Sequence, residues 1–305
     1  MIYTLTLNPS IDYVISLEHL TLGEVNRLDS ETKLPGGKGI NVSRILNRLN
    51  IPNTAVGYLG GFTGKFIADE LAQENISTHF INVDGDTRIN VKIKADTETE
   101  INGQGPIISK EQQETLLNYL RSTLTEDDVV VLAGSMPKSL PDNFYQTIID
   151  IIKEKHANFA IDTTGQALLN NLPNKPLIVK PNHHELAEMF DTKFNSLEDI
   201  FPYGQKLLQQ GAQYALVSMA GDGALFFNGD DIYLAKPLKG TVKNSVGAGD
   251  SMIAGFVGTI IEQNDPLKAF AMGVACGTAT AFSTDLADLE TINHYLEQVA
   301  IEKLN

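Results

Sequence analysis

Short apolar runs alternate along the chain with segments in which apolar residues recur every three or four positions. The short runs are typical of buried strands, and the wider spacing is typical of helices with one apolar face. Strands that alternate with helices in this way indicate a parallel sheet covered by helices. The predicted strands are Ile2–Leu7, Thr54–Leu59, Val129–Leu132, Asn158–Ile161, Leu177–Val179, Tyr214–Val217, Ala224–Phe227 and Ile232–Leu234.

Helices are predicted between most of these strands and at the end of the chain. They span Lys38–Asn50, Gly64–Glu74, Lys110–Leu124, Asp142–Lys155, His183–Phe190, Leu197–Gln209, Ala248–Gln263, Pro266–Ser283 and Leu289–Lys303. We therefore expect residues 1–305 to form a single α/β domain, in which a doubly wound, mostly parallel sheet is the middle of three layers.

Residues 13–33 and 76–101 break this rhythm. Within Thr87–Lys94, polar and apolar residues alternate from Arg88 onward, as they do in antiparallel strands with one solvated face. We expect a small antiparallel β lid formed from about residues 13–33 and 86–102. Because the exposed edge of such a sheet needs cover, we also expect a homodimer formed through the lid.

The net charge and the cysteine content limit the classes of binding partner and the cellular compartment to expect. The 23 Lys and Arg residues face 38 Asp and Glu residues, a net charge of −15, which repels nucleic-acid phosphates and anionic membrane surfaces. No apolar run reaches the ~18 residues of a membrane helix, and the N-terminal segment resembles a strand more than a signal peptide. The single cysteine, Cys276, fits a reducing compartment. We expect a cytoplasmic protein that binds neither nucleic acid nor membrane.

A glycine turn at residues 247–249 opens the predicted helix that starts at Ala248. Amide groups at such a helix start favour an anion, and a phosphoryl group in transfer is one. Asp250 lies in the first turn, where it would accept a proton from an attacking hydroxyl. The same residues also fit a plain helix cap after a tight turn. The pattern alone leaves both interpretations open.

A second glycine turn, Pro35–Gly39, opens the helix that carries Lys38 and Asn41. Glycine amides with a lysine suit a phosphate or a polyol, and the Asn41 amide offers a donor and an acceptor to sugar hydroxyls. The turn is not a Walker A loop, and Gly60–Phe66 only approaches one. No G-x-G-x-x-G fingerprint follows a predicted strand, which disfavours a nicotinamide-dependent dehydrogenase.

Polar residues follow the fifth and sixth predicted strands, at the edge where open α/β sheets bind ligands. Asn182 and Glu185 are three residues apart and suit Mg²⁺ held largely through water, although they equally suit a helix capping box. The segment that contains Ser218, Gly221 and Gly223 fits either a loop around a nucleotide or a β-hairpin turn.

Cations gather in the predicted lid. Asp12 follows the first strand, and Arg27, Arg88, Asn90 and Lys92 lie in the lid segments. In a chain of net charge −15, such cations on one face would form a local pocket for an anionic substrate. The alternation puts Arg88, Asn90 and Lys92 on the same face, which points either to solvent or into the site.

The order of these motifs is more specific than any one of them. The chain resembles the PfkB family of ribokinase-like sugar kinases along its whole length, and Pro35–Val42 and Val246–Ser251 match the two signature regions of that family. Thr4–Asp12 and Gly23–Arg27 are similar to the branch that phosphorylates ketohexose monophosphates. Thr87–Lys92 resembles the 1-phosphofructokinases of that branch more closely than its tagatose-6-phosphate kinases.

The resemblance implies a kinase that uses ATP and Mg²⁺ to convert fructose 1-phosphate into fructose 1,6-bisphosphate. The nearest alternative substrate is tagatose 6-phosphate, and a sugar-phosphate sensor without catalysis is the alternative from another class. A dehydrogenase has little support.

The resemblance also implies roles for individual residues. Asp250 would take the proton of the sugar's 6-hydroxyl, and the amides of Gly247, Ala248, Gly249 and Asp250 would stabilise the transferred group. The sugar hydroxyls would be held by Asp12, Gly37 and Asn41, with Asn90 also in the sugar site. The phosphate of the sugar would be held by Lys38, Arg88, Arg27 and Ser135. The ATP site would be lined by Lys180, Asn182, Ser218, Gly221, Gly223 and Ser245, and Mg²⁺ would be held by Asn182 and Glu185.

Overall fold

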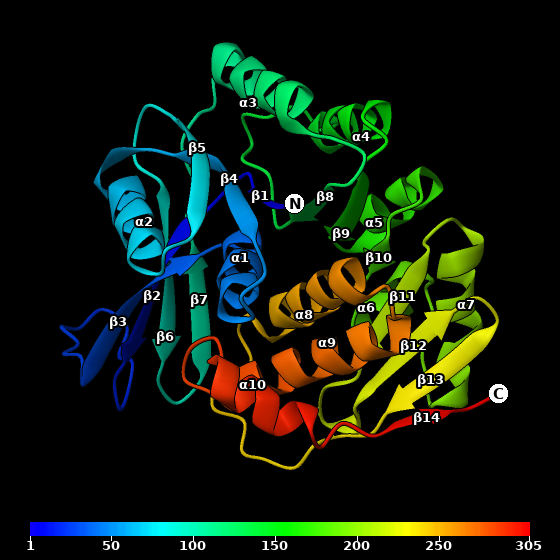
Figure 1. Ribbon diagram of the computed structural model, residues 1–305. Helices are drawn as coiled ribbons and strands as arrows, with labels where there is room; N and C mark the ends of the chain where they lie inside the picture. The colour runs from blue at the N-terminus through cyan, green and yellow to red at the C-terminus, as the bar shows by residue number, and fades with distance from the viewer.

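A ten-stranded sheet forms the centre of the protein in the computed structural model, which describes residues 1–305 (Figure 1). Its strand order is β14-β13-β12-β11-β10-β9-β8-β1-β4-β5. All pairings from β11 to β5 are parallel, and β12, β13 and β14 extend the sheet by antiparallel pairings. The strands are β1 Ile2–Thr6, β4 Asn53–Leu59, β5 Ser77–Asn82, β8 Val129–Ala133, β9 Asn158–Asp162, β10 Ile178–Val179, β11 Tyr214–Ser218, β12 Ala224–Asn228, β13 Asp231–Ala235 and β14 Ile301–Lys303.

Helices cover both faces of this sheet, as the sequence predicts. Alternate residues of each strand face opposite helix layers, so that Tyr3 and Leu5 pack with one layer and Ile2 with the other. The first layer is α3 Lys110–Thr123, α4 Phe144–Glu154, α5 Gly165–Asn171, α6 His183–Met189 and α7 Phe201–Gln209, and the second is α1 Lys38–Arg48, α8 Ala248–Gln263, α9 Pro266–Ala281 and α10 Leu289–Leu296.

The small sheet lies beside the edge of the main sheet and has the order β3-β2-β6-β7 (Figure 1). Its strands are β2 Ser10–Ser16, β3 Ser30–Gly36, β6 Arg88–Lys94 and β7 Glu98–Asn102, while α2, Gly61–Gln73, packs between the two sheets. The outer pairings are antiparallel, whereas the central β2–β6 pairing is parallel. Only residues 7–9 separate β2 from β1, so the small sheet is attached directly to the end of a central strand.

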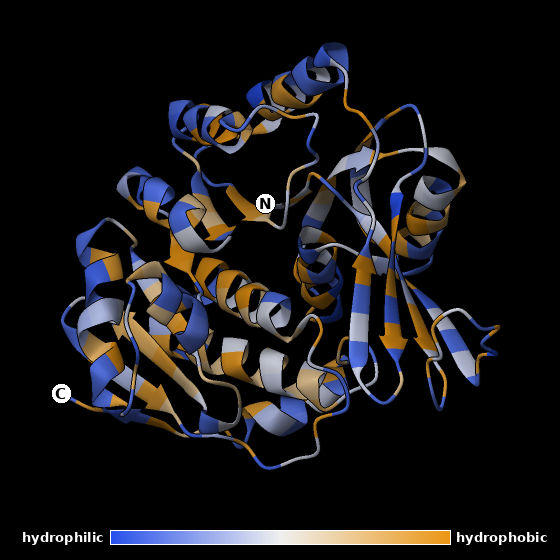
Figure 2. Cartoon of the chain, turned by 180° about the vertical axis from the view of Figure 1, so that it is seen from behind, coloured by the Kyte–Doolittle hydropathy of each residue, from blue (hydrophilic) through white to orange (hydrophobic).

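The hydropathy pattern that predicts this architecture is visible in Figure 2. The main-sheet strands are largely apolar, and the strands of the small sheet alternate between polar and apolar positions. The three-layer α/β architecture is confirmed. None of the helices combines the length and the apolar character that crossing a membrane requires.

Four sequence-based expectations differ from the structure. The segment β5 lies in the main sheet parallel to β4, although residues 76–101 were expected to lie outside the rhythm of that sheet; its sequence STHFIN lacks the apolar run that marks a buried strand. The last helix ends at Leu296, and Ile301–Lys303 instead pairs with β13 as β14. The short helix α5 has no clear apolar period and was not predicted. The lid strands also begin earlier and end later than residues 13–33, at Ser10 and Gly36.

Candidate active site

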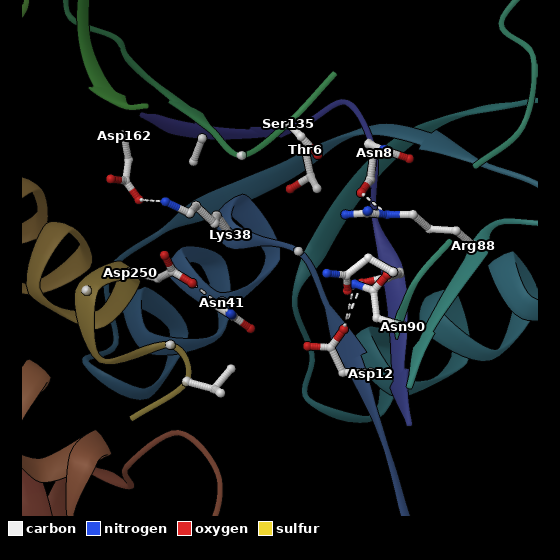
Figure 3. Close-up of a pocket in the computed structure, with 18 of the residues that line it drawn as sticks. Thr6, Asn8, Asp12, Lys38, Asn41, Arg88, Asn90, Ser135, Asp162 and Asp250 are labelled. Carbon is white, nitrogen blue, oxygen red and sulfur yellow. Dashed lines mark hydrogen bonds and ion pairs between the residues drawn. The ribbon is translucent and has the colours of Figure 1, made fainter. Parts of the chain in front are cut away.

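A cavity of about 500 Å³ lies where the carboxyl ends of β1, β8, β9 and β10 meet the inner face of the small sheet (Figure 3). The N-termini of α1 and α8 open onto it, and Ala133 and Val246 are the only apolar residues on its wall. This is the edge at which parallel sheets bind ligands. The residues predicted from the sequence that line it are Asp12, Gly37, Lys38, Asn41, Arg88, Asn90, Ser135, Lys180, Gly247, Gly249 and Asp250.

The start of α8 forms a concentrated set of amide donors. Gly247 has a φ of +78°, a left-handed conformation that favours glycine. The Ala248 amide donates to the Ser245 carbonyl at 3.3 Å, and Ala248 does not line the cavity. The amides of Gly249 and Asp250 have no acceptor within the chain. Two free donors at a helix N-terminus therefore face the cavity, which suits an anion.

Asp250 is a buried carboxylate with a raised pKa. Its side chain receives a hydrogen bond of 2.8 Å from the Asn41 amide (Figure 3). Burial, together with the negative charge of Asp162, raises the pKa of Asp250 to about 6, although Lys38, Lys180 and the Asn41 hydrogen bond oppose the shift. A carboxylate whose pKa lies close to neutral pH is a more effective general base than one with an ordinary pKa.

Asp162 completes this end of the cavity, and the sequence analysis assigned it no role. It ends β9, where its carboxylate accepts a hydrogen bond of 2.9 Å from Lys38 Nζ and lies 4.0 Å from Lys180 Nζ. Burial opposes its ionisation, but the two lysines hold the pKa of Asp162 below its ordinary value. Two carboxylates and two ammonium groups thus share a small volume, and their charges cancel.

The glycine next to Asp250 permits this arrangement. A Cβ atom on Gly249 would lie 2.8 Å from Lys180 Nζ, a distance that side-chain carbons avoid. The glycine therefore lets the lysine ammonium lie directly against the start of α8.

The small sheet supplies the other end of the cavity, where Asp12 is held by three donors. Its Oδ1 accepts hydrogen bonds from Ser10 Oγ at 2.8 Å and from Asn90 Nδ2 at 3.3 Å. Its Oδ2 lies 2.9 Å from Lys92 Nζ. A Cβ atom on Gly36 of the neighbouring strand would lie 2.5 Å from the Asp12 carboxyl carbon, so the glycine makes room for this carboxylate.

Among the cations that line the cavity, Arg88 is the one that has no carboxylate partner. Its Nε donates to the Asn8 carbonyl at 3.1 Å and its Nη1 to the Gly103 carbonyl at 3.2 Å (Figure 3). Burial lowers the pKa of Arg88, an effect that the charge of Asp12 offsets in part; an arginine stays charged nonetheless. Two backbone carbonyls thus orient an uncompensated guanidinium at the cavity wall.

Unpaired polar atoms mark the cavity as a site for a polar ligand. Three of the four buried side-chain atoms without a hydrogen-bond partner belong to Thr6, Asn8 and Asn90, which all line it. Buried polar groups in proteins are nearly always paired. The wall of this cavity therefore retains hydrogen-bonding capacity that a sugar phosphate is suited to use.

The residues expected to hold Mg²⁺ form a capping box at the start of α6. Asn182 Oδ1 accepts from the Glu185 amide at 2.9 Å, and Glu185 Oε2 accepts from the Asn182 amide at 2.8 Å. Glu185 Oε1 remains free, and its charge acts on Lys38 at the cavity. Because Mg²⁺ with a nucleotide takes most of its ligands from phosphates and water, one free carboxylate oxygen beside an amide oxygen fits this ion.

The other residues expected to bind ATP lie along the same edge of the sheet, outside the cavity. Ser218 ends β11 and forms a bridge with Asn182, next to Lys180. Gly221 and Gly223 belong to the turn that joins β11 to β12 as a hairpin, and Ser245 precedes the start of α8.

Arg27, which was expected to help hold the phosphate of the sugar, lies away from the cavity. It is exposed on the long connection between β2 and β3 and does not line the cavity wall. Within this one chain, Arg27 therefore adds no positive charge to the cavity wall beside Arg88.

Comparison with known proteins identifies the family. The profile described as pfkB family carbohydrate kinase matches residues 5–292. The chain belongs to this family. The pfkB chain is 51% identical to the 1-phosphofructokinase of Bacillus subtilis (strain 168) over 304 residues, which covers 100% of both chains. It is 37% identical to the D-tagatose-1-phosphate kinase of Bacillus licheniformis, again with 100% of both covered.

A solved structure supports the fold of this pfkB chain. Phosphofructokinase-2 of Escherichia coli, in complex with substrates and products, superposes with a TM-score of 0.91 at 25% identity, covering 98% of this chain and 99% of that one. The resemblance to ribokinase-like sugar kinases drawn from the motifs is confirmed.

Several wall residues of this pfkB protein were not assigned to the site from the sequence. They are Thr6, Asn8, Ser10, Glu100, Asn102 and Asp162. Most lie at strand ends or on the inner face of the small sheet, where only the assembled fold shows that they converge. Lys92 was a candidate from the sequence, because the strict alternation over residues 88–94 put it on the same face as Arg88.

Proposed function

We propose that this protein transfers the γ-phosphoryl group of ATP to the 6-hydroxyl of fructose 1-phosphate, which yields fructose 1,6-bisphosphate. The observation that carries the proposal is the position of Asp250, a basic buried carboxylate beside two free amides of α8. The relative that is 51% identical is named 1-phosphofructokinase, which supports the substrate.

In the proposed reaction Asp250 accepts the proton of the 6-hydroxyl while that oxygen forms its bond to the γ-phosphorus. The bond between this phosphorus and the bridging oxygen of ADP breaks, and its electrons stay on ADP. The amides of Gly249 and Asp250 stabilise the charge of the group in transfer, so catalysis consists mostly of positioning and electrostatics.

Lys38 and Lys180 extend this stabilisation. Both are anchored near Asp162 at the reaction end of the cavity, so Lys38 serves the transferred phosphoryl group here and not the sugar's own phosphate as expected from the sequence. Glu185, with Asn182 beside it, would hold Mg²⁺, which neutralises charge on the nucleotide phosphates when bound.

The lid end of the cavity holds the sugar. Asp12, Asn41 and Asn90 present acceptors and donors to its hydroxyls, with the backbone of Gly37 alongside. Arg88 and Ser135 receive its 1-phosphate, because Arg88 is the cation there that no carboxylate neutralises. A guanidinium binds phosphate through strong charged hydrogen bonds.

ATP lies along the carboxyl edge of β10 and β11 in this proposal. Lys180 and Ser218 flank its phosphates, and the turn with Gly221 and Gly223 together with Ser245 surrounds the remainder of the nucleotide. These residues are near neighbours along one edge, and this edge leads to the free amides of α8.

A ketose 1-phosphate of different configuration is the second candidate substrate. The relative that is 37% identical is named for D-tagatose 1-phosphate, which differs from fructose 1-phosphate only in the configuration at carbon 4. This compound replaces tagatose 6-phosphate as the more informative competitor, because it presents the same phosphate position to Arg88.

We also propose that two copies pair through the outer face of the small sheet. That face carries the apolar residues that alternate with the polar inner face, and Ile89 and Ile101 on it are 40% and 59% exposed. Light scattering on the purified protein tests the pairing, which an Ile101→Asp variant weakens. The requirement for ATP favours a cytoplasmic location.

The function is tested by measuring ADP release with Mg·ATP on fructose 1-phosphate, tagatose 1-phosphate, tagatose 6-phosphate, fructose 6-phosphate and unphosphorylated fructose. We expect the highest kcat/KM with fructose 1-phosphate. A preference for another sugar phosphate would contradict the substrate but keep the chemistry. Binding of fructose 1-phosphate with no turnover on any sugar would instead support a sensor.

A further inference from the structure

Lys92 is a lysine of the small sheet that is both buried and paired with a carboxylate. It lies on β6 with its side chain 8% exposed, and its Nζ is 2.9 Å from Asp12 Oδ2. It lines the cavity together with Asp12 and Arg88. A buried lysine is costly unless it is paired, so its presence on this wall calls for an explanation.

Lys92 and Asp12 retain hydrogen-bonding groups that no other residue uses. A lysine ammonium has three donors, and the contact to Asp12 uses one of them. The Asp12 carboxylate has about four acceptor positions, of which Ser10, Asn90 and Lys92 occupy three. Free donors and a free acceptor therefore lie side by side, and a sugar hydroxyl, which both donates and accepts, is complementary to them.

Charge distinguishes this position from that of Arg88. The two cations are four residues apart on the same face of β6, a separation of roughly 13 Å along a strand. Lys92 is neutralised by Asp12, whereas Arg88 contacts only backbone carbonyls. A phosphate dianion is therefore attracted to Arg88, and uncharged hydroxyls are left for Lys92.

We infer that Lys92, paired with Asp12, is a specificity-determining residue that recognises the ring hydroxyls of the substrate and leaves its phosphate to Arg88. This inference rests on the proposed function, because it assumes a phosphorylated ketose in the cavity. It assigns to Lys92 a direct contact with the substrate in addition to its contact with Asp12.

Removing the ammonium group has two consequences. The sugar hydroxyl loses a charged donor, and Asp12 remains as an unpaired negative charge in a cavity that has to accept a phosphate. We therefore expect Lys92→Met to lower kcat/KM for fructose 1-phosphate on the order of 10- to 100-fold, mainly through a higher KM.

The decisive measurement is discrimination between the substrate and its 3-deoxy and 4-deoxy analogues. The unaltered protein is expected to prefer fructose 1-phosphate over at least one analogue by on the order of 10- to 100-fold, and Lys92→Met is expected to remove most of that preference. The preference of Lys92→Met for fructose 1-phosphate over tagatose 1-phosphate should also be smaller than that of the unaltered protein. Unchanged discrimination in Lys92→Met, whatever its absolute rate, would overturn the inference.

Lys94→Met is the matched control. Lys94 lies on the same face of β6 two residues further on, forms no ion pair with Asp12 and does not line the cavity. Its kinetics should match those of the unaltered protein. Lys92→Arg keeps the positive charge and should retain more of the discrimination than Lys92→Met. A loss of discrimination that came only from misfolding would not depend on this charge.

The proposed function fails separately, if the unaltered protein does not turn over fructose 1-phosphate. The discrimination of Lys92→Met is then compared on the ketose phosphate that the unaltered protein does accept. Lost discrimination on that sugar would still support the role of Lys92, and retained discrimination would still contradict it.

Discussion

The two ends of the cavity handle charge in opposite ways. At the start of α8, the ammonium groups of Lys38 and Lys180 face the carboxylates of Asp162 and Asp250, and the four charges cancel. At the small sheet, Asp12 and Lys92 cancel as well, but Arg88 has no carboxylate partner. The site therefore has a neutral, tightly connected end at α8 and a lid end at which the Arg88 guanidinium forms no ion pair, although the exposed carboxylate of Glu100 lies on the same wall.

This difference suggests a division of labour. The charged groups of the reaction end are fixed by one another, so they need little reorganisation when charge moves during phosphoryl transfer. At the lid end, which is the recognition end in the proposed function, the Arg88 guanidinium forms no ion pair and is therefore suited to bind an anionic substrate in a protein whose net charge is −15. Changes at the first end should alter kcat, and changes at the second should alter KM.

The largest effect is expected from Asp250→Asn, because it removes the proposed base. We expect kcat to fall by on the order of 10²- to 10⁴-fold, while calorimetry still detects binding of fructose 1-phosphate. Asp69→Asn, an exposed position on α2, is the control and should behave like the unaltered protein. Unchanged turnover in Asp250→Asn would contradict the role of Asp250 as the base and, with it, the assignment of the reaction to this end of the cavity.

The recognition end is tested by Arg88→Gln. Truncating one member of a charged hydrogen-bonded pair costs about 2–5 kcal/mol, so we expect KM for fructose 1-phosphate to rise by at least about 30-fold with little change in kcat. Unphosphorylated fructose should show no such change. Arg121→Gln on the surface of α3 is the control. A fall in kcat alone would show that Arg88 serves the reaction and not recognition.

A smaller effect with a distinct signature is expected from Asp162→Asn. Asp250 has to be ionised to accept a proton, so kcat/KM rises with pH through its pKa of about 6. Without the negative charge of Asp162, ionisation of Asp250 is easier and its pKa falls. The acidic limb of the pH profile should therefore move to lower pH, together with a drop in kcat of about tenfold because Lys38 loses its anchor.

The direction of that shift separates two roles for Asp162. A purely structural residue would lower the rate without moving the acidic limb. The limb is measured as kcat/KM between about pH 5 and 8, and a shift toward higher pH would contradict the proposed interaction of the two carboxylates.

The smallest effect is expected from Gly249→Ala. The new Cβ atom would lie 2.8 Å from Lys180 Nζ, and the flexible end of a lysine is able to move away by a few tenths of an ångström. We expect kcat to fall less than about tenfold with KM for the sugar unchanged. A changed sugar KM would mean that the two ends of the cavity are coupled more closely than their separate ion pairs suggest.

The reaction end was easier to predict from the sequence than the recognition end. The glycine turns before Lys38 and Asp250 are local signals, because the same few residues both bend the chain and carry the chemistry. Arg88 was found through the alternation of a single strand. The contact of Lys92 with Asp12 depends on the β2–β6 pairing, which joins segments about eighty residues apart and has no local signature.

Other differences have the same origin. Asp162 follows an ordinary buried strand, and only the parallel order of β8, β9 and β10 brings it beside Lys38. The capping box of Asn182 and Glu185 was recognised as a pattern, but local sequence does not determine whether it also serves a metal. Strand β5 was not predicted in the main sheet because this edge strand, STHFIN, is mostly polar and lacks the apolar run of the central strands.

The attachment of the small sheet at residues 7–9 and at Gly36–Lys38 has an evolutionary consequence. In the proposed function, most side chains that contact the sugar lie on β2 and β6, whereas the groups that carry out phosphoryl transfer lie on α1, α8 and the ends of the central strands. Mutations in those strands are thus free to select a new sugar while the ancestral chemistry stays intact. Under the proposed function, proteins with this fold are able to change their sugar substrate through substitutions on one small sheet.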